Sequence, residues 1–301
     1  MNMRQAVELH RAGKLADAEA IYRRILAENP RDADALNRLG AIAYQTGHFS
    51  DATQLIGRAI AINNQVADYH LNLGSALEAQ NQLEAAVASY RRVLAMNPHH
   101  AQAHFNLGNV FRRLDQTAEA MQCYRKAIEF DPKFVQAYTN LGVCLNEQKL
   151  HMQAVAQYRI ALAIQPDFAP ALNNLSNALR SAGDLSAALE ACREALRLRP
   201  DYHHAWNNLA NIHKDQKDYP AAIEAYRRSL ALKPDAPEVL KNLAGALQEM
   251  GDLDQASAVL RRALEIRPEF FDAANQLATI FKEQALVSEA MRYFQLASRI
   301  R

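Results

Sequence analysis

The chain has 301 residues, and half of them are apolar, so there is ample material for a buried core. Its 34 lysines and arginines nearly cancel its 33 aspartates and glutamates, whereas a nucleic-acid binder usually carries a basic excess. No apolar run reaches the roughly 18 residues that a membrane span needs, and the first residues open an amphipathic segment rather than a secretory leader. We therefore expect a cytoplasmic protein with no nucleic-acid partner and no membrane insertion.

A period of 34 residues divides the whole chain. Seven prolines follow this period, with Asn64 in the one missing place: Pro30, Pro98, Pro132, Pro166, Pro200, Pro234 and Pro268. Eight alanines follow the same period without a gap: Ala52, Ala86, Ala120, Ala154, Ala188, Ala222, Ala256 and Ala290. The pattern predicts one solenoid of nine units, which are 1–32, 33–66, 67–100, 101–134, 135–168, 169–202, 203–236, 237–270 and 271–301.

Each unit has the signature of a two-helix hairpin. With the recurring proline at position 32, a first helix is expected over about positions 1–14 and a second over about 18–31. A leucine followed by a small residue at positions 7 and 8, as in Leu73-Gly74, lets two helices approach closely. Position 15 must end the first helix in a left-handed turn, and it holds glycine in four units and another residue in five: Gly13, Gly47, Gly183, Gly251, Asn81, Asp115, Lys149, Lys217 and Ala285. The next residue in three units is an aspartate that we expect to cap the second helix: Asp184, Asp218 and Asp252.

The arrangement W-x2-L-G-x2-Y, then A-x3-Y-x2-A, then P resembles the tetratricopeptide repeat over the whole chain, with Trp206 at one opening. This resemblance implies an all-α, right-handed superhelical solenoid of 34-residue helix-turn-helix repeats. First helices would line its concave surface, and the array would bind proteins rather than catalyse a reaction. Because one hairpin cannot bury its own apolar face, neighbouring units must complete the core.

Position 6 of the first helix carries a ladder of asparagines. Six successive units present Asn72, Asn106, Asn140, Asn174, Asn208 and Asn242. Asparagine is a mediocre helix former, so we expect these amides to donate to and accept from the backbone of an extended peptide. Three more asparagines, at position 9, would widen the strip: Asn109, Asn177 and Asn211. The alternative is that each amide bonds to a neighbouring repeat and holds the stack in register.

The phrases Leu172-Asn-Asn-Leu-Ser-Asn177 and Trp206-Asn-Asn-Leu-Ala-Asn211 are similar to repeats of O-linked N-acetylglucosamine transferases and SPINDLY-type proteins. That resemblance implies a second reading, in which the repeats recruit protein substrates for a glycosyltransferase domain.

Charged residues on the first helices allow two further readings. Four cations would favour acidic or phosphorylated ligands, unless they form a solvated face: Arg112, Arg113, Arg180 and Lys214. The carboxylate clamp of chaperone-binding tetratricopeptide repeats is incomplete here, because Gly245 stands where Lys241 would need an asparagine partner.

The sequence offers no catalytic residues, metal site or cofactor motif: P-loop, GxGxxG, GxSxG and HExxH are all absent. Cys123, Cys144 and Cys192 lie in mostly apolar helical segments and are expected to be buried thiols. His100 and His104 straddle a unit boundary, so packing explains them better than metal binding.

The last helix ends with apolar residues where a polar cap is expected: Phe294, Leu296, Ala297 and Ile300. The pattern indicates either that the protein continues past Arg301 or that this face docks on a partner. A homo-oligomer formed through the final helix is the third reading.

Overall fold

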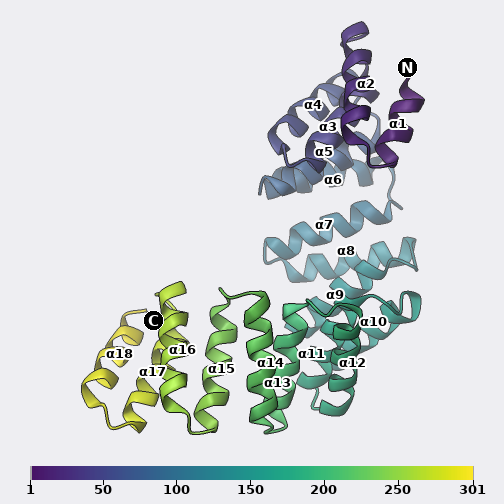
Figure 1. Ribbon diagram of the computed structural model, residues 1–301. Coiled ribbons are helices and arrows are strands. Elements are labelled where there is room, and N and C mark those ends of the chain that lie inside the picture. Colours follow the sequence, from purple (N-terminus) through teal and green to yellow (C-terminus); the bar gives the residue numbers. More distant parts are fainter. Residues whose placement is uncertain (1, 301) are drawn as a thin grey trace. The chain divides into compact units, whose positions relative to one another are not determined.

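The computed structural model describes residues 2–300, in which it has eighteen α-helices and no strand (Figure 1). The all-α repeat fold predicted from the sequence is confirmed. The helices are α1 Met3–Arg11, α2 Leu15–Glu28, α3 Ala33–Gln45, α4 Phe49–Ile62, α5 Ala67–Ala79, α6 Leu83–Met96, α7 Ala101–Arg113, α8 Thr117–Phe130, α9 Val135–Glu147, α10 His151–Ile164, α11 Ala169–Ser181, α12 Leu185–Leu198, α13 His203–Asp215, α14 Tyr219–Leu232, α15 Pro237–Glu249, α16 Leu253–Ile266, α17 Phe271–Glu283 and α18 Val287–Ile300.

The turn between the two helices of a unit follows the expected chemistry. Position 15 has a positive φ in all nine units, from 57° at Asp115 to 90° at Gly183. The first helix ends at position 13 and the second begins at position 17, one residue earlier than expected at each point. The predicted caps are present, because the Asp184, Asp218 and Asp252 side chains accept backbone N–H bonds of 3.0 to 3.2 Å.

The helices form two compact units, residues 2–144 and residues 145–300, with the division inside α9. In the first unit α3, α5 and α7 contact one another in succession, in addition to packing on their own second helices. In the second unit α11, α13, α15 and α17 do the same. First helices therefore lie along the inner side of each unit. That all nine repeats form one continuous solenoid stays a prediction.

The core of each hairpin joins position 8 to position 24. Tyr90, at position 24, is fully buried, and a Cβ added to Gly74 would stand 2.5 Å from its ring. Tyr124 makes the same contact with Gly108, at 2.7 Å. In these two hairpins the absence of a side chain at position 8 leaves the space that the tyrosine ring fills.

The residue at position 4 closes the boundary between units. Ring nitrogens at this position face the carbonyl oxygen of the residue six places earlier, from His70 to Asn64 at 3.1 Å and from His104 to Pro98 at 2.9 Å. Trp206 donates in the same way to Pro200 at 2.8 Å. His104 therefore has the packing role predicted for it, and burial lowers its pKa.

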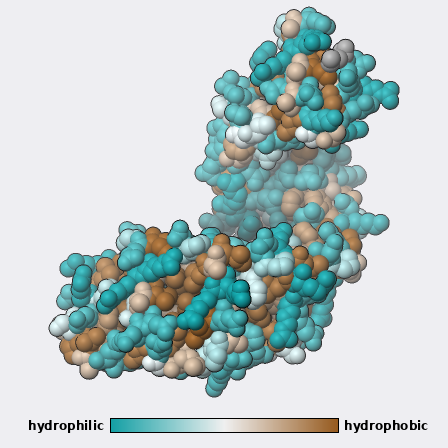
Figure 2. Space-filling model, in the orientation of Figure 1, coloured by the Kyte–Doolittle hydropathy of each residue, from teal (hydrophilic) through white to brown (hydrophobic). Residues whose placement is uncertain are grey.

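Two of the three cysteines are buried as expected, Cys144 and Cys192, whereas Cys123 is partly exposed. The expectation of burial was wrong for Cys123, because this side chain lines a surface pocket between α6, α7 and α8. On the visible face of the second unit, hydrophobic side chains show between rows of hydrophilic ones (Figure 2). No helix in residues 2–300 has the length and hydropathy to cross a lipid bilayer.

Candidate functional site: the first-helix face

Each of the two compact units has a first-helix face, which consists of positions 5, 6, 9, 12 and 13 of the first helices of its repeats. All nine predicted asparagines lie on it and are half-buried: Asn72, Asn106, Asn140, Asn174, Asn208, Asn242, Asn109, Asn177 and Asn211. Half-burial orders an amide while it leaves polar atoms near the surface.

Hydrogen bonds between neighbouring repeats recur at a separation of 35 residues, one more than the sequence period. Position 5 accepts from position 6 of the next repeat, as Asn37 does from Asn72 at 3.0 Å and Asn173 from Asn208 at 2.9 Å. Position 12 pairs with position 13 of the next repeat, as in Arg180–Asp215 at 2.8 Å. Neighbouring first helices are therefore held in register by polar side chains as well as by packing.

In the first unit, the ladder amides differ in which atom they use. Asn72 and Asn140 both donate through Nδ2 to the preceding repeat, the latter to Asn109 Oδ1 at 2.8 Å. Asn106 instead accepts through Oδ1 from Gln102 of its own helix, at 2.8 Å. An amide that uses Nδ2 internally keeps its oxygen for an outside group, and one that uses Oδ1 keeps its two N–H donors.

The second unit shows the same alternation. Asn208 donates to Asn173, and Asn173 donates in turn to Asn174 Oδ1 at 3.2 Å. Asn242 has no hydrogen bond among the residues that the structure describes. The reading that the ladder holds the stack in register thus applies to Asn72, Asn140 and Asn208, and not to Asn106, Asn174 and Asn242.

Position 9 is oriented by the buried tyrosine of its own hairpin. Tyr124 donates to Asn109 Oδ1 at 2.9 Å, and Tyr226 donates to Asn211 Oδ1 at 2.6 Å. Asn109 Oδ1 accepts from both Tyr124 and Asn140, so its acceptor capacity is used. The Nδ2 groups of Asn109 and Asn211 are left as donors on the first-helix face.

A hollow of about 280 Å³ opens on this face in the first unit. Its walls are polar and come from three successive first helices, α3, α5 and α7. The lining residues are Tyr44, Ser75, Glu78, Ala79, Asn106, Asn109 and Arg113. Two predicted residues, Asn106 and Asn109, thus share one surface depression.

Glu78 is the charged centre of this hollow. Tyr90 donates to its Oε2 at 3.1 Å, and Arg113 lies 3.6 Å from its Oε1. Loss of hydration raises the pKa of the Glu78 carboxyl, against the opposing influence of Tyr90 and Arg113. The hollow therefore has little net charge and offers hydrogen bonds rather than a strong ionic attraction.

The predicted cations differ in how far they are exposed. Arg180 is engaged with Asp215, and its side chain is 27% exposed. Lys214 is half-buried, whereas Arg112 is exposed. The 34-residue period does not reveal the pairing of Arg180 with Asp215, because this contact spans 35 residues.

Of the lining residues, Arg113 was predicted as a cation for acidic ligands, Glu78 was placed on the first helices without a ligand role, and Ser75 was missed. Ser75 occupies position 9, as Asn109 does, so the register that found Asn109 was enough to find it. No group of three His, Cys, Asp or Glu side chains with metal-site geometry is present in residues 2–300.

Comparison with known protein families places the chain among repeat proteins. Two models described as tetratricopeptide repeat match residues 9–75 and 67–100. The model described as cilia and flagella-associated protein 70 C-terminal domain matches residues 89–300. No curated protein matches the sequence.

Several solved structures have a similar fold. The chain matches the crystal structure of the APC/C hetero-tetramer Cut9–Hcn1 at 20% identity with a TM-score of 0.71, over 88% of this chain and 52% of that one. It thus spans about half the length of that chain. PilF of Pseudomonas aeruginosa matches at 21% identity and a TM-score of 0.61, over 71% and 97% of the two chains. MamA matches at 25% identity and a TM-score of 0.50, over 55% and 96%.

These likenesses agree with the hairpin geometry described above. Tetratricopeptide-repeat proteins are generally scaffolds for protein interactions. The chain belongs to the tetratricopeptide-repeat family, in the group that the model of the cilia and flagella-associated protein 70 C-terminal domain describes.

Proposed function

We propose that the first-helix face binds extended peptide segments by hydrogen bonding to their backbone, without catalysis. The observation that carries this is the alternation of amide atoms: Asn72, Asn140 and Asn208 keep Oδ1 outward, whereas Asn106 and Asn174 keep Nδ2. An extended peptide backbone alternates carbonyl acceptors and N–H donors, so acceptor and donor amides along a strip complement it.

Hydrogen bonds within the protein hold several amides of the first-helix face in place before a ligand binds. Asn109 and Asn211 are held by buried tyrosine hydroxyls, and Asn208 is held by a nearly buried Asn173. Side chains that are already ordered lose less conformational entropy on binding, which favours affinity. Recognition of backbone atoms does not depend on the ligand's side chains, so we expect broad sequence tolerance.

The test uses a displayed library of random twelve-residue peptides, from which binders to the unaltered chain are selected. The ladder variant combines Asn106→Ala, Asn174→Ala and Asn242→Ala, which remove the three ladder amides without a bond to a neighbouring repeat. We expect it to bind the selected peptides at least tenfold more weakly, with an unchanged melting temperature.

The matched control removes three amides from exposed or outer positions of second helices: Gln54→Ala, Gln122→Ala and Gln153→Ala. It should retain full affinity. Equal affinity of the ladder variant and the unaltered chain would reject the first-helix face as the binding surface.

Self-association through α18 is a second candidate, favoured by the exposure of its apolar residues. Phe294 is 40% exposed, although the residue at position 24 is buried in the other eight repeats, and Val287 and Met291 are 65% and 58% exposed. Concentration-dependent light scattering that Met291→Glu abolishes would support it, and a monomer at all concentrations would exclude it.

Recruitment of substrates for a glycosyltransferase domain rests on the asparagine phrases alone. Sequencing the reading frame beyond codon 301 tests this recruitment hypothesis. The hypothesis requires a sugar-nucleotide-binding domain downstream, and a stop codon directly after codon 301 would exclude it.

A further inference from the structure

The outer side of α18 departs from the repeat pattern at three positions. Position 22 holds Arg292, whereas the other eight units hold alanine, glutamine or glutamate there. Position 23 holds Tyr293, the one aromatic residue at this position. Position 26 holds Leu296, where seven other units have a charged residue: Arg24, Arg58, Arg92, Lys126, Glu194, Arg228 and Arg262. Hairpin packing cannot require these residues, because the other units fold without them.

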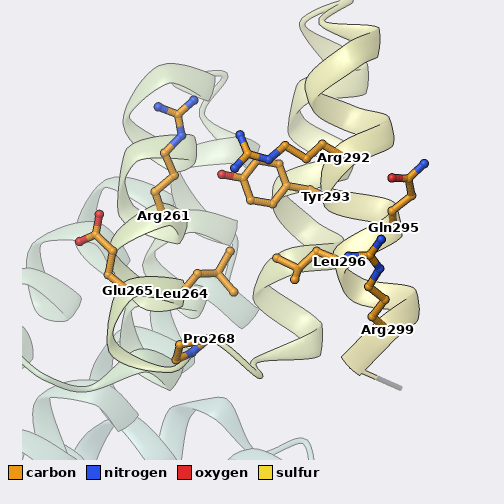
Figure 3. Close-up of a pocket in the computed structure, with 9 residues that line it drawn as sticks. All are labelled: Arg261, Leu264, Glu265, Pro268, Arg292, Tyr293, Gln295, Leu296 and Arg299. Carbon is orange, nitrogen blue, oxygen red and sulfur yellow. The ribbon is translucent and has the colours of Figure 1, made fainter.

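The three departures line a single cavity of about 460 Å³ between α16 and α18, the α16–α18 groove (Figure 3). Figure 3 shows Leu264 and Leu296 pointing toward each other, with the Tyr293 ring above them. These side chains form an apolar floor. The groove is built from second helices and is therefore separate from the first-helix face.

Positive charge surrounds this floor. Arg261, Arg292 and Arg299 all line the groove, against one carboxylate, Glu265. In Figure 3 the side chains of Arg261 and Arg299 lie on opposite sides of the cavity, so they do not converge on a point that a single small ion would occupy. None of the three arginines has an ion pair within residues 2–300.

Aromatic rings hold two of these cations at the groove. The Arg261 guanidinium carbon lies 5.3 Å from the Phe281 ring centroid, and that of Arg292 lies 5.8 Å from the Tyr293 centroid. A guanidinium that lies over a ring keeps its N–H edge available, and that edge matches a carboxylate.

We propose that the α16–α18 groove binds an acidic peptide segment of a partner protein. An apolar side chain of the peptide packs on Leu264 and Leu296, and carboxylates on either side of it pair with Arg261, Arg292 and Arg299. The apolar floor and the separated arginines together indicate the class of ligand. The floor can bury an apolar side chain, which a free anion lacks, and the separated arginines match carboxylates that are distributed along a peptide. This site is separate from the peptide-binding surface that we propose on the first-helix face.

The test measures binding of a fluorescein-labelled twelve-residue peptide in which two central leucines are flanked by glutamates and aspartates. The unaltered chain should bind this peptide and not its counterpart with glutamine and asparagine at every acidic position. Replacement of two exposed arginines, Arg292→Gln with Arg299→Gln, should weaken binding at least fivefold without a change in the melting temperature. The control, Arg91→Gln with Arg92→Gln, removes two exposed arginines from α6, one of them at the repeat position of Arg261, and should leave affinity unchanged.

Leu296→Arg separates a specific groove from general electrostatic attraction. This substitution restores the residue common at position 26 and adds a positive charge while it removes the apolar floor. The groove predicts weaker binding, whereas charge attraction alone predicts tighter binding. Tighter binding by Leu296→Arg, equal loss in the α6 control, or binding to phosphatidylserine vesicles without binding to the peptide would each overturn the proposal.

Discussion

At the scale of single residues, the contact between positions 8 and 24 limits what each repeat tolerates. Tyr90 fills the space beside Gly74, so the two residues behave as one packing unit. The pairing varies among the repeats: the Tyr226 hairpin has Ala210 at position 8, and the Cys192 hairpin has Ser176. The pattern of leucine followed by a small residue was readable from the sequence, and its cause is this ring.

Gly74→Ala should lower the free energy of unfolding by about 1–3 kcal/mol, because the new Cβ would overlap the buried Tyr90 ring. Gly57→Ala is the matched control, since nothing lies within 4 Å of its added Cβ. A helix interior favours alanine over glycine, so this control should stabilise the chain by about 0.5–1 kcal/mol. Urea unfolding followed by circular dichroism measures both, and an unharmed Gly74→Ala would contradict the contact.

The turn residue at position 15 gives a second prediction. Ala285 has a φ of 60°, a conformation that costs a Cβ-bearing residue about 1 kcal/mol or more. Ala285→Gly should therefore raise the melting temperature, and Gly251→Ala, at a φ of 80°, should lower it. Differential scanning calorimetry compares the two; shifts of the same sign would show that backbone conformation does not govern this turn.

Burial also sets the chemistry of the thiols. Cys192 donates to the Ala205 carbonyl at 3.1 Å, and loss of hydration raises the pKa of its thiol to about 12. Since the thiolate is the reactive form, Cys192 should react with Ellman's reagent at pH 8 roughly a hundredfold more slowly in the native chain than in urea. Mass spectrometry of the labelled peptides checks this, and equal rates would place Cys192 outside the core.

At the scale of helices, polar side chains connect each first helix to the next. The contacts join positions 5 and 6, or 12 and 13, of adjacent repeats. A stack held in this way adds directional bonds to the apolar interfaces, so repeats that lack the amide pair should be less tightly coupled.

The two halves of the ladder should differ in stability when each is mutated. Asn208→Ala would leave the buried Asn173 oxygen without its donor and should cost about 1–3 kcal/mol. Asn242→Ala breaks no hydrogen bond in the described residues, and alanine is the better helix former, so its stability should be equal or higher. Chemical unfolding of both variants separates a structural amide from a ligand-binding one, and equal destabilisation would refute the alternation.

At the scale of the whole molecule, the fold was predictable and the orientation of its surface groups was not. Periodic prolines, alanines and turn residues located every hairpin within a residue, because each reports a local backbone or packing requirement. The ladder was visible for the same reason. Which amide atom faces outward depends on partners such as Asn37, Asn173 and Tyr124, and these come from another helix at a spacing of 35 or 15 residues.

The α16–α18 groove was outside the reach of the periodic pattern for the opposite reason. The periodic pattern consists of residues that agree between repeats, and it therefore does not include the three exceptions Arg292, Tyr293 and Leu296. Their common position around one cavity became evident only when two second helices were placed side by side.

Backbone N-methylation of a bound peptide shows whether the first-helix face recognises the peptide backbone. Calorimetric titration would compare a selected peptide with a copy methylated at alternate backbone nitrogens and with a copy of shuffled sequence. Backbone recognition predicts that methylation weakens binding at least tenfold, because each methyl group removes a donor to an asparagine oxygen. Shuffling should change affinity little. Full affinity for the methylated peptide, with loss of affinity for the shuffled one, would contradict the account.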